Sequence, residues 1–267
     1  AGAIADVLPA PWNARTRVHE YGGGAWTVAA DVLYFSHFVD GRIYALALPD
    51  SPDPGDPAES VDPADSAQAA KAQTPSQTPQ ALTPEGAWRY ADFRIDRPRN
   101  RLICVCEDHT GEVVLNRLVA VPLTGAAADD PKAIQVLADR ADFFASPALS
   151  PDGRSLAWLT WDNPNLPWDG TTLWQATIAA DGQLSEPQAI AGGPDESVFQ
   201  PLWSPTNVLY FVSDRSGWWN LYRSIAGKVE ALYPLAAEFG LPQWVFGMAT
   251  YDFLLSLIHI SEPTRPY

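Results

Sequence analysis

Short runs of β-branched and aromatic residues alternate with turn residues along most of the chain, and helical periodicity is nearly absent. VLYFS (32–36) is followed by the turn residues Asp40 and Gly41 and then by RIYALAL (42–48). Two such runs around an Asp-Gly turn predict a β-hairpin, although this loop is longer than two residues. We therefore expect an all-β chain of short antiparallel strands.

This pattern of strands and turns repeats at a nearly constant spacing. Aligning RIDRPRNRLICV (94–105) with ALSPDGRSLAWL (148–159) places Leu102 on Leu156, 54 residues apart, and LWSPTNVLYFV (202–212) continues the series. A period of about 40–55 residues with three or four strands per unit is typical of β-propeller blades. A single blade cannot bury both of its faces, so blades stack against their neighbours.

Four units are visible, and a fifth begins where Tyr251 aligns with Tyr210, 41 residues before it. We predict a partial β-propeller of about four to five blades, each a four-stranded antiparallel sheet, with an incomplete ring. A β-sandwich is the alternative, but a sandwich has no reason to repeat Ser-Pro turns at a fixed spacing. The expected units lie near 26–48, 90–123, 143–190, 197–232 and 243–253.

Two segments depart from the repeat. Residues 51–86 hold seven prolines and no aromatic residue, which predicts a disordered low-complexity insertion between strands. The tail LSLIHISEPTRPY (255–267) has an apolar run where a turn is expected, and it resembles the translated read-through of a sequencing adapter. We expect 1–254 to form the propeller and 255–267 to be a non-native tail, with a genuine edge strand as the alternative.

The charge and composition narrow the range of partners. The chain has 32 acidic and 17 basic residues, a formal net charge of −15, and 11 Trp among 267 residues. Such an acidic surface repels phosphate backbones and anionic lipids, so we expect neither nucleic acid nor membrane as a partner. Most of the Trp side chains are expected in the cores of the blades.

Cysteine content and termini suggest an intracellular protein. Cys104 and Cys106 are too close in sequence for an unstrained bridge, and we expect buried free thiols. No apolar run approaches the roughly 20 residues that span a bilayer. Because the only methionine is Met248, we expect the natural N-terminus to be missing, and cytoplasmic localisation is the default expectation.

The sequence offers no complete catalytic or metal site. The nucleophile motif G-x-S-x-G is absent. The histidines at 19, 37, 109 and 259 are isolated, so we expect turn or surface positions, no metal and no cofactor. The glycines at 22–24 precede a strand rather than a helix. They are expected to let the backbone pass close to a neighbouring blade or the central channel rather than to bind phosphate.

Two loop segments carry side chains that are hard to explain as core. WDNPNLPWDGT (161–171) combines Asp162, Asp169 and Trp168. The side-chain oxygens of its Asp and Asn residues could bind calcium or form Asx turns, and we favour the turns. SDRSGWWNLYR (213–223) brings Arg215 and Trp218 together, a combination typical of interfaces.

Three segments resemble a known family. VHEYGGGAW (18–26), SPDGRSLAWLTWDNPNLPWDGTTLW (150–174) and SDRSGWWNLYR (213–223) are similar to the N-terminal propeller of bacterial prolyl oligopeptidase-family serine peptidases, in the branch of acylaminoacyl peptidases and dipeptidyl aminopeptidases. The resemblance runs from about 15 to 254, apart from the insertion. The Trp-Asp-Asn-Pro-Asn segment is specific, whereas Ser-Pro-Asp-Gly turns occur in many propellers.

The resemblance implies a role in gating. In that family the propeller lies over a C-terminal α/β-hydrolase domain, which supplies the Ser-Asp-His triad, and it restricts access to short peptides. No residue of this chain matches the triad, so we expect the parent protein to be an oligopeptide-cleaving serine peptidase and this chain to be inert alone. The expected partners are the hydrolase domain and short peptides.

The candidate residues for the substrate channel or the domain interface are Glu20, Tyr21, Trp168, Asp169, Arg215 and Trp218. Glu20 could pair with the free amine of a peptide, or instead with Arg15 or Arg17. Two other functions stay open: a free-standing propeller that scaffolds protein partners, as TolB-like proteins do, and a propeller glycosidase. A glycosidase needs paired carboxylates in the channel, which are not visible at the strand starts.

Overall fold

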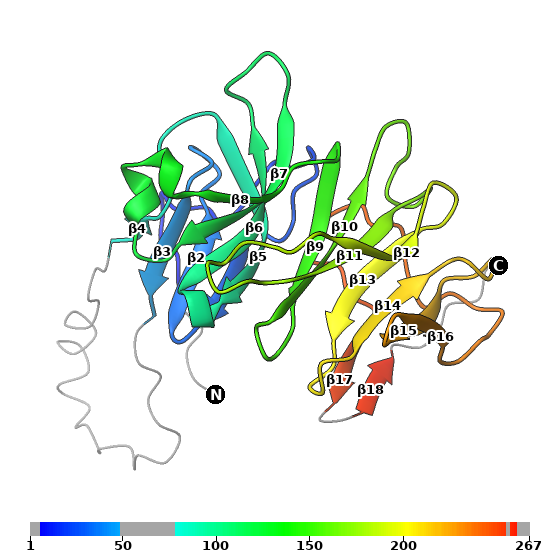
Figure 1. The fold of residues 1–267 in the computed structure, drawn as a ribbon. Helices are drawn as coiled ribbons and strands as arrows, with labels where there is room; N and C mark the ends of the chain where they lie inside the picture. Colours follow the sequence, from blue (N-terminus) through cyan, green and yellow to red (C-terminus); the bar gives the residue numbers. More distant parts are fainter. Residues whose placement is uncertain (1–5, 49–77, 255–256, 261–267) are drawn as a thin grey trace, which may run out of the picture.

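The computed structural model describes residues 6–48, 78–254 and 257–260, and it shows successive antiparallel sheets arranged side by side (Figure 1). The first sheet pairs its strands in chain order: β1 (Trp26–Ala29), β2 (Val32–Ser36), β3 (Ile43–Ala47) and β4 (Gln80–Ala81). The second sheet has the same order: β5 (Trp88–Asp96), β6 (Arg101–Asp108), β7 (Leu115–Pro122) and β8 (Gln135–Ala138).

The remaining sheets repeat this plan. The third contains β9 (Phe143–Leu149), β10 (Ser155–Trp161), β11 (Thr172–Thr177) and β12 (Gln188–Gly192). The fourth contains β13 (Val198–Trp203), β14 (Leu209–Ser213), β15 (Asn220–Ile225) and β16 (Lys228–Ala231). A two-stranded sheet follows, made of β17 (Tyr251–Leu254) and β18 (Leu257–Ile260). The described helices are 3-10 turns at Arg97–Arg99, Ala126–Ala128 and Pro131–Ala133.

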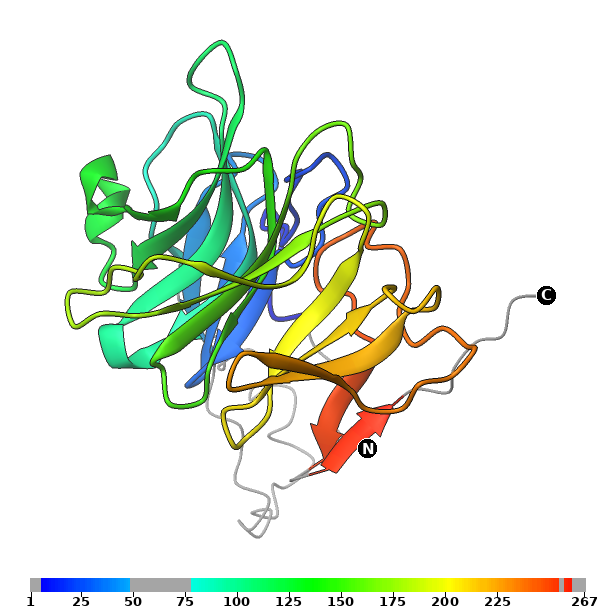
Figure 2. The ribbon, with the colours of Figure 1, turned by 45° about the vertical axis from the view of Figure 1, so that its right-hand side comes forward.

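The first strands of consecutive sheets lie next to one another, so β1, β5, β9 and β13 are the innermost strands of four adjacent blades. The turned view shows the sheets fanned about a common centre (Figure 2). This is the arrangement of propeller blades, and the prediction of a partial β-propeller is confirmed. No helix in the described part of the chain is long and apolar enough to cross a membrane.

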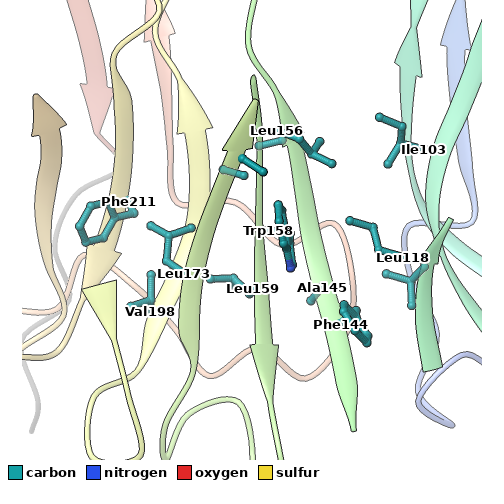
Figure 3. Packing of buried hydrophobic residues seen from close by; sticks show 14 of the residues in the cluster. Ile103, Leu118, Phe144, Ala145, Leu156, Trp158, Leu159, Leu173, Val198 and Phe211 are labelled. Carbon is teal, nitrogen blue, oxygen red and sulfur yellow. The ribbon is translucent and has the colours of Figure 1, made fainter. Parts of the chain in front are cut away.

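The core lies between the sheets and covers both faces of the second strand in the second and third sheets. β6 is almost entirely buried along its length, as is β10, where Trp158 is 2% exposed. Trp158 belongs to a cluster of buried apolar side chains that extends from Leu118 of β7 through the third sheet to Phe211 of β14 (Figure 3). A strand covered on both faces reads as a continuous apolar run rather than an alternating one. Cys104 and Cys106 are free and buried in β6, as predicted.

Three innermost strands carry a bulge at the same blade position. The pairing register shifts at Asp92 in β5, at Ser146 in β9 and at Gln200 in β13, and each residue has a positive φ. These positions are 54 residues apart, the period seen in the sequence. The bulges also link blades: Asp92 Oδ2 accepts the N–H of Ser146 at 2.6 Å, and the Gln200 amide donates to the Tyr251 carbonyl at 2.6 Å.

Glycines 22–24 bring the chain close to two other segments, as predicted. Gly23 forms a parallel bridge with Phe246, and a Cβ on Gly23 would lie 2.4 Å from the Phe246 carbonyl oxygen. Gly24 accepts the N–H of Asp92 at 2.8 Å. Only a residue without a side chain permits such contacts. The segment before the first sheet is thereby tied to the segment after the fourth.

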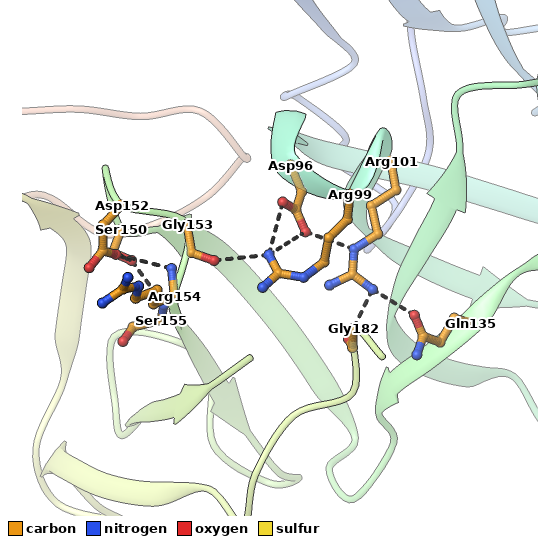
Figure 4. Close-up of polar contacts among 10 residues, drawn as sticks. All are labelled: Asp96, Arg99, Arg101, Gln135, Ser150, Asp152, Gly153, Arg154, Ser155 and Gly182. Atoms are coloured by element: carbon orange, nitrogen blue, oxygen red, sulfur yellow. Dashed lines mark hydrogen bonds and ion pairs between the residues drawn. The ribbon is translucent and has the colours of Figure 1, made fainter. Parts of the chain in front are cut away.

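A polar cluster joins the second and third sheets at their other end (Figure 4). Asp96 is fully buried, and its Oδ2 accepts from Nε of Arg101 at 2.8 Å. Arg101 also donates to the carbonyl of Gly182, in the β11–β12 turn, at 2.9 Å. Arg99 bridges Asp96 to the carbonyl of Gly153 in the β9–β10 turn. Each arginine therefore connects one blade to the next.

The structure differs from the sequence prediction at blade edges. β4 and β8 lie beyond the units expected at 26–48 and 90–123, because a long connection precedes each outer strand. Residues 51–77 of the expected insertion lie outside the described residues. Its last part, 78–86, contains β4 paired with β3, so the end of the insertion was placed too late.

The structure also differs from the sequence prediction at the end of the chain. Tyr251 exchanges hydrogen bonds with Gln200 of β13, so β17 lies beside an innermost strand. Its alignment with Tyr210, which belongs to the second strand of its blade, was therefore wrong. Within the suspected tail, β18 pairs with β17, while 255–256 and 261–267 lie outside the described residues. That the tail is non-native stays a prediction.

Candidate functional site

A cavity of about 700 Å³ opens on the face formed by the loops between the second and third strands of the blades. The β6–β7, β8–β9 and β10–β11 connections meet there, together with the segments before the first sheet and after the fourth. Its size is that of a small-molecule or short-peptide site. The lining comprises 19–22, 113–117, 141–143, 165–168 and 243–246, with Glu107, His109, Asp139, Trp161 and Asn163.

One wall of the cavity is aromatic. The rings of Trp168 and Trp244 are 4.4 Å apart, and Tyr21 meets Trp244 edge-on at 5.9 Å. Phe143 and Trp161 stack at 5.4 Å. Tyr21 and Trp244 are each more than half exposed, so large apolar surfaces are available to a ligand. Rigid aromatic side chains of this kind bind apolar groups at a small entropic cost.

His19 lines the cavity next to its aromatic wall. Its ring packs against Phe143, Trp161 and Phe246 at centroid distances of 4.8–5.4 Å. Burial lowers the pKa of His19 to about 4, so the ring is neutral near pH 7. The backbone at His19 and Glu20 is left-handed, with φ of 54° and 63°. Such strained residues are frequent at functional sites.

Acidic groups supply most of the charge in the cavity lining. Glu107 is buried and accepts the N–H of His19 at 2.6 Å, the His109 ring at 3.0 Å and the Arg89 guanidinium at 3.5 Å. Glu20 pairs with the same Arg89 at 3.1 Å. Asp139 and Asp142 also line the cavity. The site combines an aromatic surface with carboxylates, a combination suited to groups that carry an amine.

Hydrogen bonds between loops hold the cavity together. Asp142 Oδ2 accepts the N–H of Asn163 at 2.9 Å, and Asp162 Oδ1 accepts the N–H of Asp142 at 2.7 Å. Asn165 donates to the carbonyl of Pro194 at 2.8 Å. The polar side chains of the 161–171 loop therefore position the walls. In the described part of the chain, no three His, Cys, Asp or Glu side chains gather into a metal site.

The structure brings three of the six candidate residues into the cavity: Glu20, Tyr21 and Trp168. Glu20 is largely exposed and pairs with Arg89, not with Arg15 or Arg17. Glu20 and Tyr21 were chosen because the 18–26 segment resembles the peptidase family, and Trp168 because a Trp in the 161–171 loop is hard to explain as core.

The other three candidates lie outside the cavity lining. Asp169 Oδ2 accepts the N–H of Leu166, three residues before it, at 2.9 Å. An Asx turn closes on the backbone two residues after the Asp, so this bond differs from the Asx turn that the sequence favoured. Arg215 pairs with Glu196 at 2.8 Å, and its guanidinium lies over the ring of Tyr222. The carbonyl of Trp218 accepts from Ser216, within the same turn. These groups order the loops of the third and fourth blades.

Sequence reasoning missed three cavity residues: His19, Glu107 and Trp244. His19 was expected at a turn or surface position. It lies in a turn, and its ring also lines the cavity. Glu107 is the last residue but one of β6, and nothing in its local sequence distinguishes it from a solvent-facing acid. Trp244 was assigned to a fifth unit of the repeat, although the periodicity does not place it at a loop face.

No protein-family model matches the chain, and no curated protein sequence is similar to it. Solved structures do match. A puromycin hydrolase is 38% identical with a TM-score of 0.78, over 93% of this chain and 36% of that one. A puromycin-hydrolyzing peptidase of Mycobacterium tuberculosis is 36% identical with a TM-score of 0.79, over 96% of this chain and 38% of that one. The chain thus spans little more than a third of these relatives.

Two distant structures share the fold alone. Prolyl oligopeptidase B from Galerina marginata is 11% identical with a TM-score of 0.52, over 82% of this chain and 30% of that one. A putative TolB from Agrobacterium tumefaciens is 15% identical with a TM-score of 0.51, over 80% of this chain and 63% of that one. The similarity to the TolB protein is therefore much weaker than the similarity to the two hydrolases.

Proposed function

Because the chain has the β-propeller of the prolyl oligopeptidase family, we propose that it binds and gates short peptides for a serine-type peptidase. The catalytic α/β-hydrolase domain would be supplied by residues beyond this chain. The observation that carries the proposal is the 36–38% identity to puromycin-cleaving enzymes along more than nine-tenths of the chain. The other domain of such a protein would perform acyl-enzyme chemistry.

The cavity supports the gating role. Its loops come from the second and third blades and from the segments before the first sheet and after the fourth, so a ligand there contacts parts of the chain that are far apart in sequence. Tyr21, Trp168 and Trp244 offer flat apolar surfaces, and the carboxylates near them attract a protonated amine. A volume of about 700 Å³ admits a short peptide and excludes a folded protein.

The first experiment is to sequence the gene beyond this chain and to express the longer protein that it encodes. The reading frame past the codon for Leu254 should encode a G-x-S-x-G segment, and the longer protein should react with a fluorophosphonate probe and cleave aminoacyl arylamides. The 267-residue chain should do neither. A locus without a second domain, or hydrolysis by the chain alone, would refute the proposal and favour a TolB-like scaffold.

The second experiment tests the cavity in that longer protein. Trp244→Ala should raise KM for a short peptide about tenfold, as expected for the loss of an exposed aromatic contact worth roughly 1–1.5 kcal/mol. Trp26→Ala is the matched control, because Trp26 is similarly exposed but lies on β1 outside the cavity. Equal effects of the two substitutions would show that the cavity does not bind substrate.

A further inference from the structure

Beside the large cavity is a smaller one, of about 250 Å³, whose charge is opposite to that of the chain. Its lining includes Arg15, Arg17 and Arg89 and two histidines, with Asp40 as the acidic member. The whole chain carries nearly twice as many acidic as basic residues. A positive pocket on so acidic a protein concentrates anions locally.

Two of these arginines are held on one aromatic ring. The guanidinium carbons of Arg15 and Arg17 lie 5.0 and 4.5 Å from the centroid of Phe38. Within the described residues neither arginine forms an ion pair. Two like charges gathered on one ring repel each other, and cation–π attraction offsets only part of this cost. An anion between or beside them would offset the rest.

The backbone fixes where these arginines stand. The N–H of Arg15 donates to the Ser36 carbonyl at 3.1 Å, and the N–H of Phe38 donates to the Asn13 carbonyl at 2.9 Å. The extended segment 13–17 is thus attached to the β2–β3 turn that carries Phe38. Residues two apart in an extended segment face the same side. The two guanidinium groups are therefore positioned before any ligand arrives.

The nearby carboxylates of the protein are already engaged. Asp40 accepts the Tyr44 hydroxyl at 2.6 Å and the N–H of Arg42 at 3.0 Å. Glu20 and Glu107 both pair with Arg89. None of these three carboxylates forms an ion pair with Arg15 or Arg17, so both guanidinium groups remain available to an anion.

The small pocket adjoins the large cavity. His109 lines both, and Arg89, which lines the small pocket, bonds to two carboxylates of the large one. We propose that Arg15 and Arg17, stacked on Phe38, bind a carboxylate of a short peptide whose apolar part occupies the large cavity. This inference rests on the proposed function. The planar fork of a guanidinium matches a carboxylate with two parallel hydrogen bonds. The carboxylate is the peptide's C-terminus or an acidic side chain.

The test measures binding to the 267-residue chain at low ionic strength, using quenching of tryptophan fluorescence. Three peptides separate the sources of the carboxylate: Phe-Ala-Ala, its C-terminal amide, and Phe-Asp-Ala-amide. A hydrogen-bonded charge pair is worth about tenfold or more in affinity. We expect at least one carboxylate-bearing peptide to bind about tenfold more tightly than Phe-Ala-Ala-amide, and the tighter one identifies the source.

Substitutions of the two arginines show whether they are responsible for the preference for carboxylate-bearing peptides. R15Q/R17Q should remove the preference for the carboxylate, and R15K/R17K should keep part of it, because lysine preserves charge without the fork. R140Q is the matched control, since Arg140 is exposed on the β8–β9 loop at the same face but lines neither pocket. Near-ultraviolet circular dichroism verifies that all variants are folded.

Three outcomes would overturn the inference. The first is equal binding of the acidic and amidated peptides, and the second is an equal loss in R140Q and R15Q/R17Q. The third is competition by inorganic phosphate without any difference among the peptides, which would indicate a general anion site. Peptide hydrolysis by the longer protein despite any of these results would leave the proposed function intact. Carboxylate-dependent binding without a hydrolase domain would refute only the proposed function.

Discussion

A single histidine illustrates how burial, rather than sequence context, determines chemistry. His19 has no metal-binding pattern around it, yet its ring is packed between three aromatic residues and its pKa is lowered by burial. In the unfolded chain the same imidazole titrates near 6.5. The folded and unfolded states therefore bind different numbers of protons at pH values between these two pKa values.

We expect this difference to make stability depend on pH. As the pH falls from 6.5 toward 4, the unfolded state takes up a proton at His19 and the folded state does not, so the free energy of unfolding decreases, by about 3 kcal/mol over the whole interval. Urea denaturation at pH 7 and pH 4.5 should show a smaller loss for His19→Asn than for the wild type. The same loss in both proteins would show that His19 is not the group responsible.

Glycine at 23 is required by a close approach of two backbones. A Cβ there would lie 2.4 Å from the Phe246 carbonyl oxygen, whereas one on Gly217 would meet nothing within 4 Å. Both residues have a similar positive φ, 86° and 82°. The pair therefore separates steric contact from backbone strain.

Gly23→Ala should destabilise the protein more than Gly217→Ala. Strain at a positive φ costs each variant about 1 kcal/mol, and overpacking adds roughly 1–3 kcal/mol at Gly23. The midpoint of urea denaturation measures both values. Equal midpoints would mean that the segment before the first sheet is not held against Phe246 in solution.

At the scale of elements, the bulged inner strands and the arginine clusters join the blades. The bulges at Asp92, Ser146 and Gln200 follow the sequence period, although the sequence alone indicated only the turns. A bulge redirects a strand and frees backbone groups for other partners. Here the bulged residues bond to adjacent innermost strands, the N–H of Ser146 to Asp92 and the side chain of Gln200 to Tyr251, so the repeat positions the contacts as well as the strands.

Arg101→Ala tests the contribution of the arginine cluster that links the second and third blades. The substitution leaves the Asp96 carboxylate fully buried with Arg99 as its remaining ionic partner, and it should cost about 3 kcal/mol of stability. Arg223→Ala is the comparison, because Arg223 pairs with a half-exposed Glu230, and its denaturation midpoint should hardly change. A small effect of Arg101→Ala would show that the bonds of Arg101 contribute little to holding the second and third blades together.

At the scale of the molecule, the first sheet has one face with no neighbouring blade in the described structure. Ala29 of β1 packs toward the second sheet, while Trp26 and Val28 point the other way and are 62% and 48% exposed. Large apolar side chains grouped on an innermost strand form a surface that favours association.

We expect the 267-residue chain to self-associate as its concentration rises, and W26S/V28T to shift it toward the monomer. Val136→Thr is the control, because Val136 is 42% exposed on the outer strand β8. Sedimentation velocity from low to high micromolar concentration measures the change. A wild-type protein that stays monomeric throughout would contradict this prediction.

The sequence by itself determined the strands, the turns and the blade period, because these depend on residues a few positions apart. VLYFS became β2, and RIYALAL contains β3. It could not determine the outer strands β4 and β8, which are short and follow long connections. Backbone pairing with the preceding strand holds them in place, and their own sequence carries little signal.

Only the tertiary structure decided the two pockets. The large cavity joins residues near 20, 110, 140, 165 and 245, and the small one joins Arg15 and Arg17 to the Phe38 ring and to Arg89. Glu20, Tyr21 and Trp168 could be chosen from the sequence by family resemblance and residue type, but Arg89, Glu107 and Trp244 could not. Their proximity arises from the packing of blades about one centre, a geometry that no local pattern of residues encodes.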